Sequence, residues 1–174
     1  MRKVEVTPYN AQWVSMFEDE AITLRHIFGE QLVALHHIGS TSVPGLEAKP
    51  IIDIMPVVKD IKLVDEHNQS MQKIGYEPMG ENGIPGRKYF QKGGDNRTHH
   101  VHVYPMGSPH IERHLAFRDY LRTHPSVAKK YGELKRKWAQ EFPYDIESYI
   151  QGKERLVVKI EQQALEWYRQ YHQD

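Results

Sequence analysis

Hydrophobic and polar positions follow two different patterns in the two parts of this 174-residue chain. Up to about residue 105, short apolar runs bounded by Gly, Pro or Asn alternate with longer segments whose apolar residues recur at helical spacing. The short runs predict β-strands and the periodic segments predict helices. Beyond Pro105 only the helical period remains. The pattern therefore predicts an α+β fold, in which a mixed β-sheet flanked by helices is followed by a C-terminal helical segment.

The boundaries of the expected elements are marked by capping and turn residues. Asn10 and Asp145 are suitable N-caps, and Gly29 is a suitable helix end. In chain order we expect an arm or edge strand at 1–6, a helix at 10–29, strands at 32–38 and 51–58, a helix at 60–74, a strand beginning near 76, a hairpin of 87–92 and 99–104, and helices at 110–123, 127–142 and 145–167. Because each of the last three helices has an apolar face to bury, we expect residues 106–174 to pack on a core formed by 1–105, as a single domain over 1–174.

Composition narrows the class of protein. Lys+Arg and Asp+Glu are equal at 23 each, so net charge gives no reason to expect nucleic-acid binding. The chain has no cysteine, which excludes disulfides, a thiol nucleophile and cysteine-ligated zinc. No apolar stretch approaches the roughly 18 residues of a membrane span, and the N-terminus lacks the apolar core of a signal peptide. We therefore expect a soluble, cytoplasmic protein without a membrane partner.

The stretch from Ile38 to Ile54 carries the first candidate residues. It joins two apolar runs that predict buried strands, and Asp53 is the one carboxylate inside the second run. An ionised carboxylate there needs a cation or hydrogen-bond donors, so Asp53 is a candidate metal ligand. A structural pair with a buried Lys or Arg is the alternative. Gly39 and Ser40 offer a backbone and a hydroxyl that can approach an anion closely, although a tight strand exit capped by Ser40 explains them as well.

Two histidines on a later predicted strand are candidates for the same site. Residues i and i+2 of a strand share a face, so His100 and His102 point the same way. A His-x-His pair on a strand suits a transition metal or can donate to phosphate. Two half-exposed histidines on an edge strand are the alternative. If this strand lies beside Asp53, the site is a carboxylate with two imidazoles.

Further basic residues have simpler explanations. Arg87 and Lys88 precede two aromatic residues of a predicted strand and alternate across it, so at most one of them faces a pocket. A surface charge is the simpler explanation for each alone. A basic stripe recurs every four residues in the first C-terminal helix, formed by His110, His114, Arg118 and Arg122. A solvated helix face accounts for this stripe.

The order of these motifs resembles a known family. Gly39-Ser40, a loop and Asp53 in an apolar strand resemble the signature of the nucleotidyltransferase superfamily related to DNA polymerase β. The string GSTSVPGLEAKPIIDI (39–54) resembles the GrpB family of small bacterial proteins more closely, and HHVHVYP (99–105), HLAFRDYLRTHP (114–125) and YIQGK (149–153) follow in the family's order. The resemblance covers nearly the whole chain and implies a nucleotidyltransferase-like fold. Some GrpB proteins are joined to a dephospho-CoA kinase domain, which implies a link to that enzyme.

The resemblance also implies roles for individual residues. Asp53 would hold a divalent metal ion (Mg²⁺, Mn²⁺ or Zn²⁺), with His100 and His102 completing its ligands or acting as a base. A nucleotide or another small phosphorylated ligand would be bound by Gly39, Ser40, Thr41, Lys49, Arg118, Lys135, Tyr149 and Lys153.

One position departs from the superfamily pattern and leaves two functions open. A second carboxylate normally stands two residues after the first, on the same strand face, and this chain has Met55 there. A two-metal site needs several oxygen ligands. The chain is therefore either a metal-dependent enzyme that transfers a nucleotidyl or phosphoryl group from a nucleoside triphosphate, or a catalytically degenerate module that binds a nucleotide or a CoA precursor. Neither the acceptor nor the oligomeric state follows from the sequence.

Overall fold

The protein consists of two compact units built from interleaved segments. A computed structural model describes residues 2–171. The first unit, here called the sheet unit, comprises residues 12–38 and 51–111. The second, the helical unit, comprises residues 2–11, 39–50 and 112–171. The chain thus crosses between the units several times, and the packing of one unit on the other stays a prediction.

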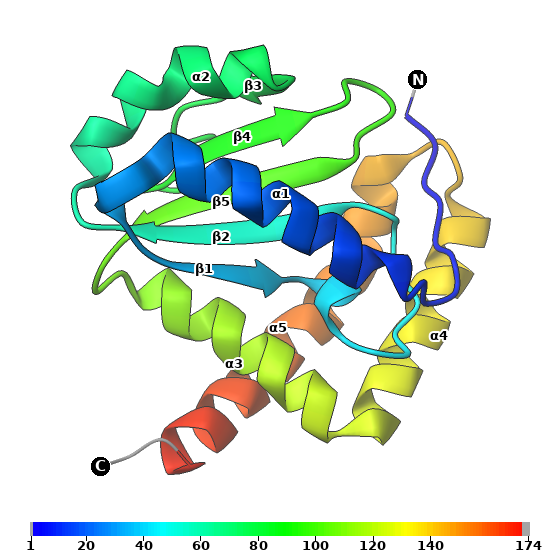
Figure 1. Cartoon of the computed structure of the whole chain (residues 1–174). Coiled ribbons are helices and arrows are strands. Elements are labelled where there is room, and N and C mark those ends of the chain that lie inside the picture. Colours follow the sequence, from blue (N-terminus) through cyan, green and yellow to red (C-terminus); the bar gives the residue numbers. More distant parts are fainter. Residues whose placement is uncertain (1, 172–174) are drawn as a thin grey trace. The chain divides into compact units, whose positions relative to one another are not determined.

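The sheet unit contains one five-stranded mixed sheet with the order β1-β2-β5-β4-β3 (Figure 1). Strands β2 and β5 are parallel, whereas the other neighbouring pairs are antiparallel. This confirms the predicted mixed sheet and hairpin. The strands are β1 (Leu32–Ile38), β2 (Ile52–Val58), β3 (Tyr76–Pro78), β4 (Lys88–Lys92) and β5 (His99–Pro105).

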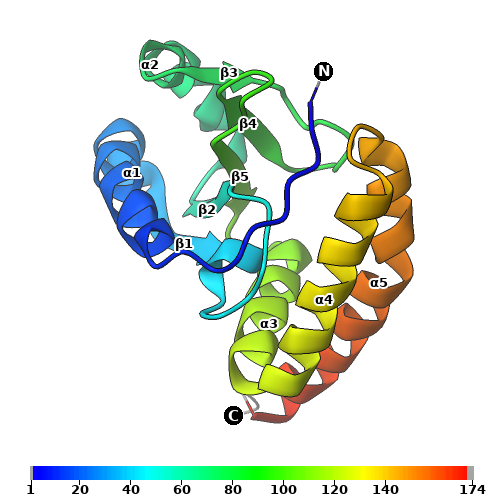
Figure 2. The same cartoon turned by 90° about the vertical axis from the view of Figure 1, so that its right-hand side faces the viewer.

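Helix α1 (Gln12–Phe28) lies across one face of the sheet, as Figures 1 and 2 show. Its buried residues recur at the predicted helical spacing: Trp13, Ala21, Leu24 and Phe28. They face a core whose strand residues Ile54 and Val101 are completely buried. A short 3-10 turn (Gly29–Gln31) then leads into β1.

The predicted helix over 60–74 is only partly correct. The segment Ile61–His67 is a 3-10 helix, and only Asn68–Lys73 is α-helical (α2). At its start Asp60 is the N-cap, because its side chain accepts a hydrogen bond from the backbone N–H of Lys62.

The helical unit contains three helices that lie side by side in Figure 2. They are α3 (Pro109–Thr123), which enters this unit at residue 112, α4 (Pro125–Glu141) and α5 (Ile146–Tyr171). Asp145 caps α5 as predicted, because its carboxylate accepts from the backbone N–H of Ser148. No helix among the described residues is long and apolar enough to cross a membrane.

The loop after β1 belongs to the core of the helical unit. After a 3-10 turn at Ser40–Ser42, Val43 and Leu46 are buried in one cluster with side chains of the helices: Leu121, Ala128, Tyr131 and Ile160. The N-terminal arm is not a full strand, since it forms one isolated bridge, between Thr7 and Ala48. The apolar residues of the loop and arm therefore pack with the helices.

Candidate functional site

The sheet unit brings Asp53, His100 and His102 together on neighbouring strands. Strand β2 carries Asp53 and runs parallel to β5, where His100 is its direct partner in register. The alternation of β5 then places His102 on the same face, while Val101 and Val103 turn into the core with no exposure. One ligand atom from each of the three side chains lies within 4.8 Å of the others. We call this group the Asp53 centre.

Both imidazoles point at the same carboxylate oxygen. The Nε2 atom of His102 lies 3.0 Å from Oδ1 of Asp53, and the Nδ1 atom of His100 lies 3.4 Å from it. The side chains are half-buried, with 26% of the Asp53 side chain and 13% of the His102 side chain exposed. The carboxylate therefore has hydrogen-bond donors as partners rather than the buried Lys or Arg considered as an alternative.

Two arginines contact the far nitrogens of these imidazoles. Arg87 Nη1 lies 3.3 Å from His102 Nδ1, and Arg97 Nη1 lies 3.1 Å from His100 Nε2. A guanidinium group only donates hydrogen bonds, so each imidazole nitrogen that faces an arginine is an acceptor. The nitrogens that face Asp53 then carry the protons. The result is two chains of donors that end on one carboxylate.

This arrangement holds Asp53 in its ionised form. Burial by itself would raise the pKa of the carboxyl group, but the hydrogen bonds from His100 and His102 and their electrostatic attraction outweigh it. The net effect is a pKa far below the usual value for aspartate. The hydrogen bonds from the two imidazoles therefore favour the ionised form of Asp53.

The three ligand atoms fit a divalent metal ion by position. Ligands at about 2.0–2.2 Å from one ion are about 3.0–3.5 Å from each other, and the two distances to Asp53 fall in this range. One carboxylate with two imidazoles favours Mn²⁺ or Zn²⁺ over Mg²⁺, which prefers oxygen. Met55 is completely buried and supplies no second carboxylate on this strand.

A second group of predicted residues converges in the helical unit. Lys49 Nζ and Lys153 Nζ lie 5.0 and 5.2 Å from the ring centre of Tyr149, and Lys135 Nζ lies 4.6 Å from the ring centre of Tyr131. These are cation–π distances. We call these five residues the lysine–tyrosine cluster. Sequence reasoning named four of them and overlooked Tyr131, which stands one helical turn before Lys135 on α4.

Lys135 is the unusual member of the cluster. Its side chain is 2% exposed, and its ammonium nitrogen has no hydrogen-bond partner among the described residues. Burial, followed by the positive charges of Lys153 and Lys49, lowers the pKa of Lys135 well below that of a free lysine, although Glu47 opposes this. The buried hydroxyl of Tyr149 also lacks a partner among these residues. Such a donor-rich, poorly compensated cluster is suited to bind an anion.

The remaining predicted residues are placed separately. Gly39 begins the turn after β1 with a φ of 72°, a left-handed conformation that glycine adopts without strain. Ser40 then opens the 3-10 turn, and Thr41 is buried. Arg118 forms an ion pair with Asp119 at 2.8 Å. Ser40 belongs to the helical unit and Asp53 to the sheet unit, so a shared cleft stays a prediction.

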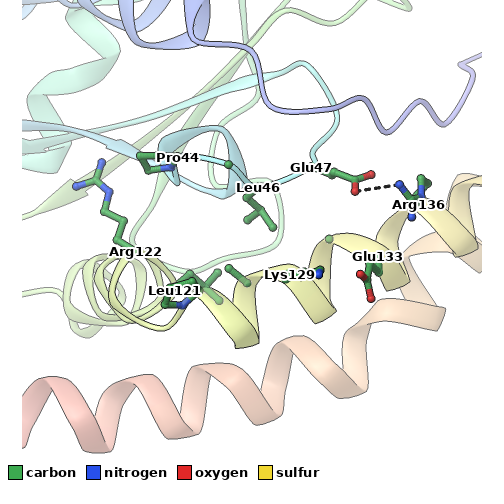
Figure 3. A pocket seen from close by; sticks show the side chains of 12 residues that line it. Pro44, Leu46, Glu47, Leu121, Arg122, Lys129, Glu133 and Arg136 are labelled. Carbon is green, nitrogen blue, oxygen red and sulfur yellow. Dashed lines mark hydrogen bonds and ion pairs between the residues drawn. The ribbon is translucent and has the colours of Figure 1, made fainter.

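A pocket of about 600 Å³ lies in the helical unit between the 44–47 loop and helices α3 and α4 (Figure 3). Leu46 and Leu121 form its apolar part, and charged side chains from both walls surround it. Glu47 pairs with Arg136 at 3.2 Å across one end of the pocket. None of the site residues predicted from the sequence lines it.

Of Arg87 and Lys88, Arg87 is the residue that faces inward, so a surface charge is the wrong explanation for it. Arg87 is 7% exposed, and its guanidinium donates to the carbonyl oxygens of Glu81 and Asn82 as well as contacting His102. Arg97 was not considered. The sequence indicates a contact with His100 only by placing Arg97 three residues before it in a hairpin, and basic residues are common at such positions.

The fold is similar to that of a poly(U) polymerase. Over 78% of this chain and 43% of the other, the structure matches the Cid1 poly(U) polymerase with a TM-score of 0.52 and 8% sequence identity. At this identity the likeness concerns the fold alone. The closer likeness is to the crystal structure of conserved protein GrpB from Enterococcus faecalis, with a TM-score of 0.92, 48% identity, and 94% and 99% of the two chains covered.

The chain belongs to the GrpB protein family, whose sequence profile matches residues 3–163. It is 51% identical to the UPF0157 protein YqkA of Bacillus subtilis over 95% of this chain, but spans only 48% of that protein's length. It is 34% identical to the glutamate-rich protein GrpB of Alkalihalophilus pseudofirmus, over 91% of this chain and 94% of the relative. A dephospho-CoA kinase of Mycobacterium leprae matches at 24% identity, with 45% of its length covered.

Proposed function

We propose that this protein is a metal-dependent transferase that moves a nucleotidyl group from a nucleoside triphosphate to an acceptor. The observation that carries the proposal is the convergence of Asp53, His100 and His102 at neighbouring strands of a nucleotidyltransferase-like sheet. In such a reaction an acceptor oxygen attacks the α-phosphorus, and pyrophosphate leaves. A bound divalent ion would neutralise the charge that develops on the phosphate oxygens.

The residues of the Asp53 centre would each have a distinct task. Asp53, kept ionised by its hydrogen bonds, would provide the anionic ligand for the ion. His100 and His102 would complete its ligands through the nitrogens that face Asp53. The imidazoles shift the expected preference from Mg²⁺ toward Mn²⁺ or Zn²⁺.

In the helical unit, the lysine–tyrosine cluster would bind phosphate groups. Three ammonium groups gather around two aromatic rings there, and Lys135 has no hydrogen-bond partner among the described residues. A phosphate oxygen would provide that partner and would relieve the mutual repulsion of the lysines. Gly39, Ser40 and Arg118 are further proposed contacts of a phosphorylated ligand, carried over from the family resemblance.

A second candidate function is a module that binds a nucleotide or a CoA precursor without turning it over. The buried Met55 favours this alternative, because it replaces the second carboxylate of a two-metal site. The match to a dephospho-CoA kinase suggests CoA precursors as ligands to test.

A thermal-shift panel tests the proposal and separates the two functions. The four nucleoside triphosphates and dephospho-CoA are each added with Mg²⁺, Mn²⁺ or Zn²⁺, to the wild type and to Asp53→Asn. A transferase is expected to show a nucleotide shift that requires a metal ion and is lost in Asp53→Asn. Stabilisation by nucleotide or dephospho-CoA without any metal effect would support the binding module, and the transferase proposal would then be abandoned.

A further inference from the structure

The polarity of the hydrogen bonds around the Asp53 centre conflicts with direct metal binding. A metal-ligating imidazole uses one unprotonated nitrogen and normally donates its other N–H to a carboxylate, a carbonyl or water. Here the outer partner of each imidazole is an arginine, which only donates. The nitrogens that should ligate the metal therefore carry protons, and those that face away from it act as acceptors.

Binding of a metal ion by all three residues would require each imidazole to move its proton, whereas binding by Asp53 and His100 requires this of His100 alone. The proton of His100 would leave Nδ1 for Nε2, where it would meet the N–H groups of Arg97 at 3.1 Å. The proton of His102 would likewise leave Nε2 for Nδ1, which lies 3.3 Å from Nη1 of Arg87. Two donors that face each other at this distance repel. The arginines therefore oppose metal binding unless a guanidinium moves.

The two arginines differ in how firmly they are held. Arg87 is buried, donates to two backbone carbonyls and lies 4.7 Å from the ring centre of Tyr89. Arg97 lies in the hairpin turn between β4 and β5, is only half-buried, and contacts one backbone carbonyl, that of Gly94, besides His100. Moving the Arg97 guanidinium therefore breaks fewer hydrogen bonds and exposes less buried surface than moving that of Arg87.

We propose that Arg97 couples metal binding to the binding of a phosphate-like anion at the Asp53 centre. In the protein alone, Arg97 holds His100 in the tautomer that weakens metal binding. A phosphate group is a better partner for a guanidinium than a neutral imidazole, because the contact is charge-assisted and can be bidentate. When the anion binds the guanidinium of Arg97, the proton of His100 can move from Nδ1 to Nε2, and Nδ1 becomes a metal ligand. Metal and anion then each raise the affinity of the other.

This inference rests on the metal centre proposed above, and its first test does not need activity. Nitrogen-15 NMR of the histidine side chains, recorded without metal, reports which ring nitrogen carries the proton. We expect His100 with the proton on Nδ1 and His102 with the proton on Nε2. A His100 proton on Nε2 would overturn the inference, whatever the metal does.

The second test is a Mn²⁺ titration by calorimetry of the wild type and three variants at position 97. Arg97→Gln offers a carbonyl oxygen to accept from the His100 N–H, so we expect Mn²⁺ affinity to rise by about tenfold. Arg97→Met removes the charge and the donor but offers no acceptor, so its gain is expected to be smaller. Arg97→Lys keeps a donor and should stay near the wild type. Equal gains in the Gln and Met variants would show a charge effect alone and would overturn the hydrogen-bond argument.

The third test addresses the coupling itself with sulfate, which resembles a phosphate group and complexes Mn²⁺ only weakly. At matched ionic strength, replacing chloride by sulfate should raise the Mn²⁺ affinity of the wild type and leave Arg97→Gln unchanged. No response of the wild type would overturn the inference while the proposed metal centre still stands. If neither the wild type nor Arg97→Gln binds Mn²⁺ under any of these conditions, the metal centre and the coupling fall together.

Discussion

The Asp53 centre and the lysine–tyrosine cluster handle buried charge in opposite ways. In the sheet unit, a carboxylate is surrounded by donors, and even the far sides of the imidazoles have partners. In the helical unit, Lys135 is buried against an aromatic ring without a hydrogen-bond partner among the described residues. A ligand at the first site must displace existing hydrogen bonds, whereas a ligand at the second adds a missing one. The first site is therefore stable without a ligand, and the second gains stability only when an anion arrives.

The largest expected effect is the loss of metal response in Asp53→Asn. Asparagine keeps one oxygen that can accept from an imidazole but has no charge for the ion. We expect Mn²⁺ affinity to fall by about a hundredfold or more, measured by calorimetry, because the only carboxylate of the centre is removed. Asp65→Asn is the matched control, since Asp65 is exposed and pairs with Lys88. Unchanged Mn²⁺ binding in Asp53→Asn would remove the centre as the metal site.

A large effect is also expected from Met55→Asp, which restores the second carboxylate of the superfamily. Met55 is completely buried, so an aspartate there should lower the free energy of unfolding by several kcal/mol in the absence of metal. Mg²⁺ should recover part of this loss and should bind more tightly than in the wild type, because the site then has two carboxylates. Denaturant titrations with and without Mg²⁺ measure both effects. A variant that is destabilised but shows no response to Mg²⁺ would indicate that position 55 does not face the ion.

An intermediate and opposite effect is expected from Lys135→Met in the cluster. Removing a buried ammonium group without a partner should raise the free energy of unfolding by about 1–3 kcal/mol. The same change should weaken binding of inorganic triphosphate by about tenfold, since one charge-assisted hydrogen bond is lost. Lys137→Met is the matched control, because Lys137 is exposed on the same helix. A variant that is less stable than the wild type, with triphosphate binding intact, would contradict the assigned role.

The pH dependence of stability should separate the two sites. The pKa of Lys135 is lower in the folded chain than in the unfolded one, so between these two values the unfolded chain binds more protons. Its contribution therefore makes the wild type more stable as pH rises from the folded pKa toward about 10.4, and this slope should be absent in Lys135→Met. For Asp53, whose folded pKa is depressed, the stabilisation is present above about 3.9 and is lost as pH falls below it. Denaturant titrations across pH measure both slopes.

The smallest expected effect is that of Ser40→Ala. If the Ser40 hydroxyl contacts a phosphate, nucleotide affinity should fall severalfold, which corresponds to one hydrogen bond of about 1 kcal/mol. Stability should change little, because Ser40 is only half-buried. Ser126→Ala is a suitable control on an exposed position of α4. Equal nucleotide affinity in wild type and Ser40→Ala would leave this loop with a structural role.

The sequence by itself determined the elements and much of the candidate chemistry. Apolar runs and helical spacing predicted every strand of the sheet, and the alternation along β5 predicted that His100 and His102 share a face. Neighbouring residues are enough to predict these features, because the backbone geometry of a strand or helix fixes which side chains share a face. The family resemblance was confirmed by the sequence profile over residues 3–163.

Only the tertiary structure decided which partners these residues have. The sequence did not decide which of Arg87 and Lys88 faces inward. In the structure Arg87 does, because its guanidinium donates to the carbonyl oxygens of Glu81 and Asn82 and contacts His102. The sequence showed the loop at 39–50 only as a connection between two strands, whereas its apolar residues Val43 and Leu46 pack among helices more than seventy positions away in the chain. Burial and hydrogen-bond polarity depend on contacts between distant segments, and these contacts decide whether a histidine offers a proton or a lone pair.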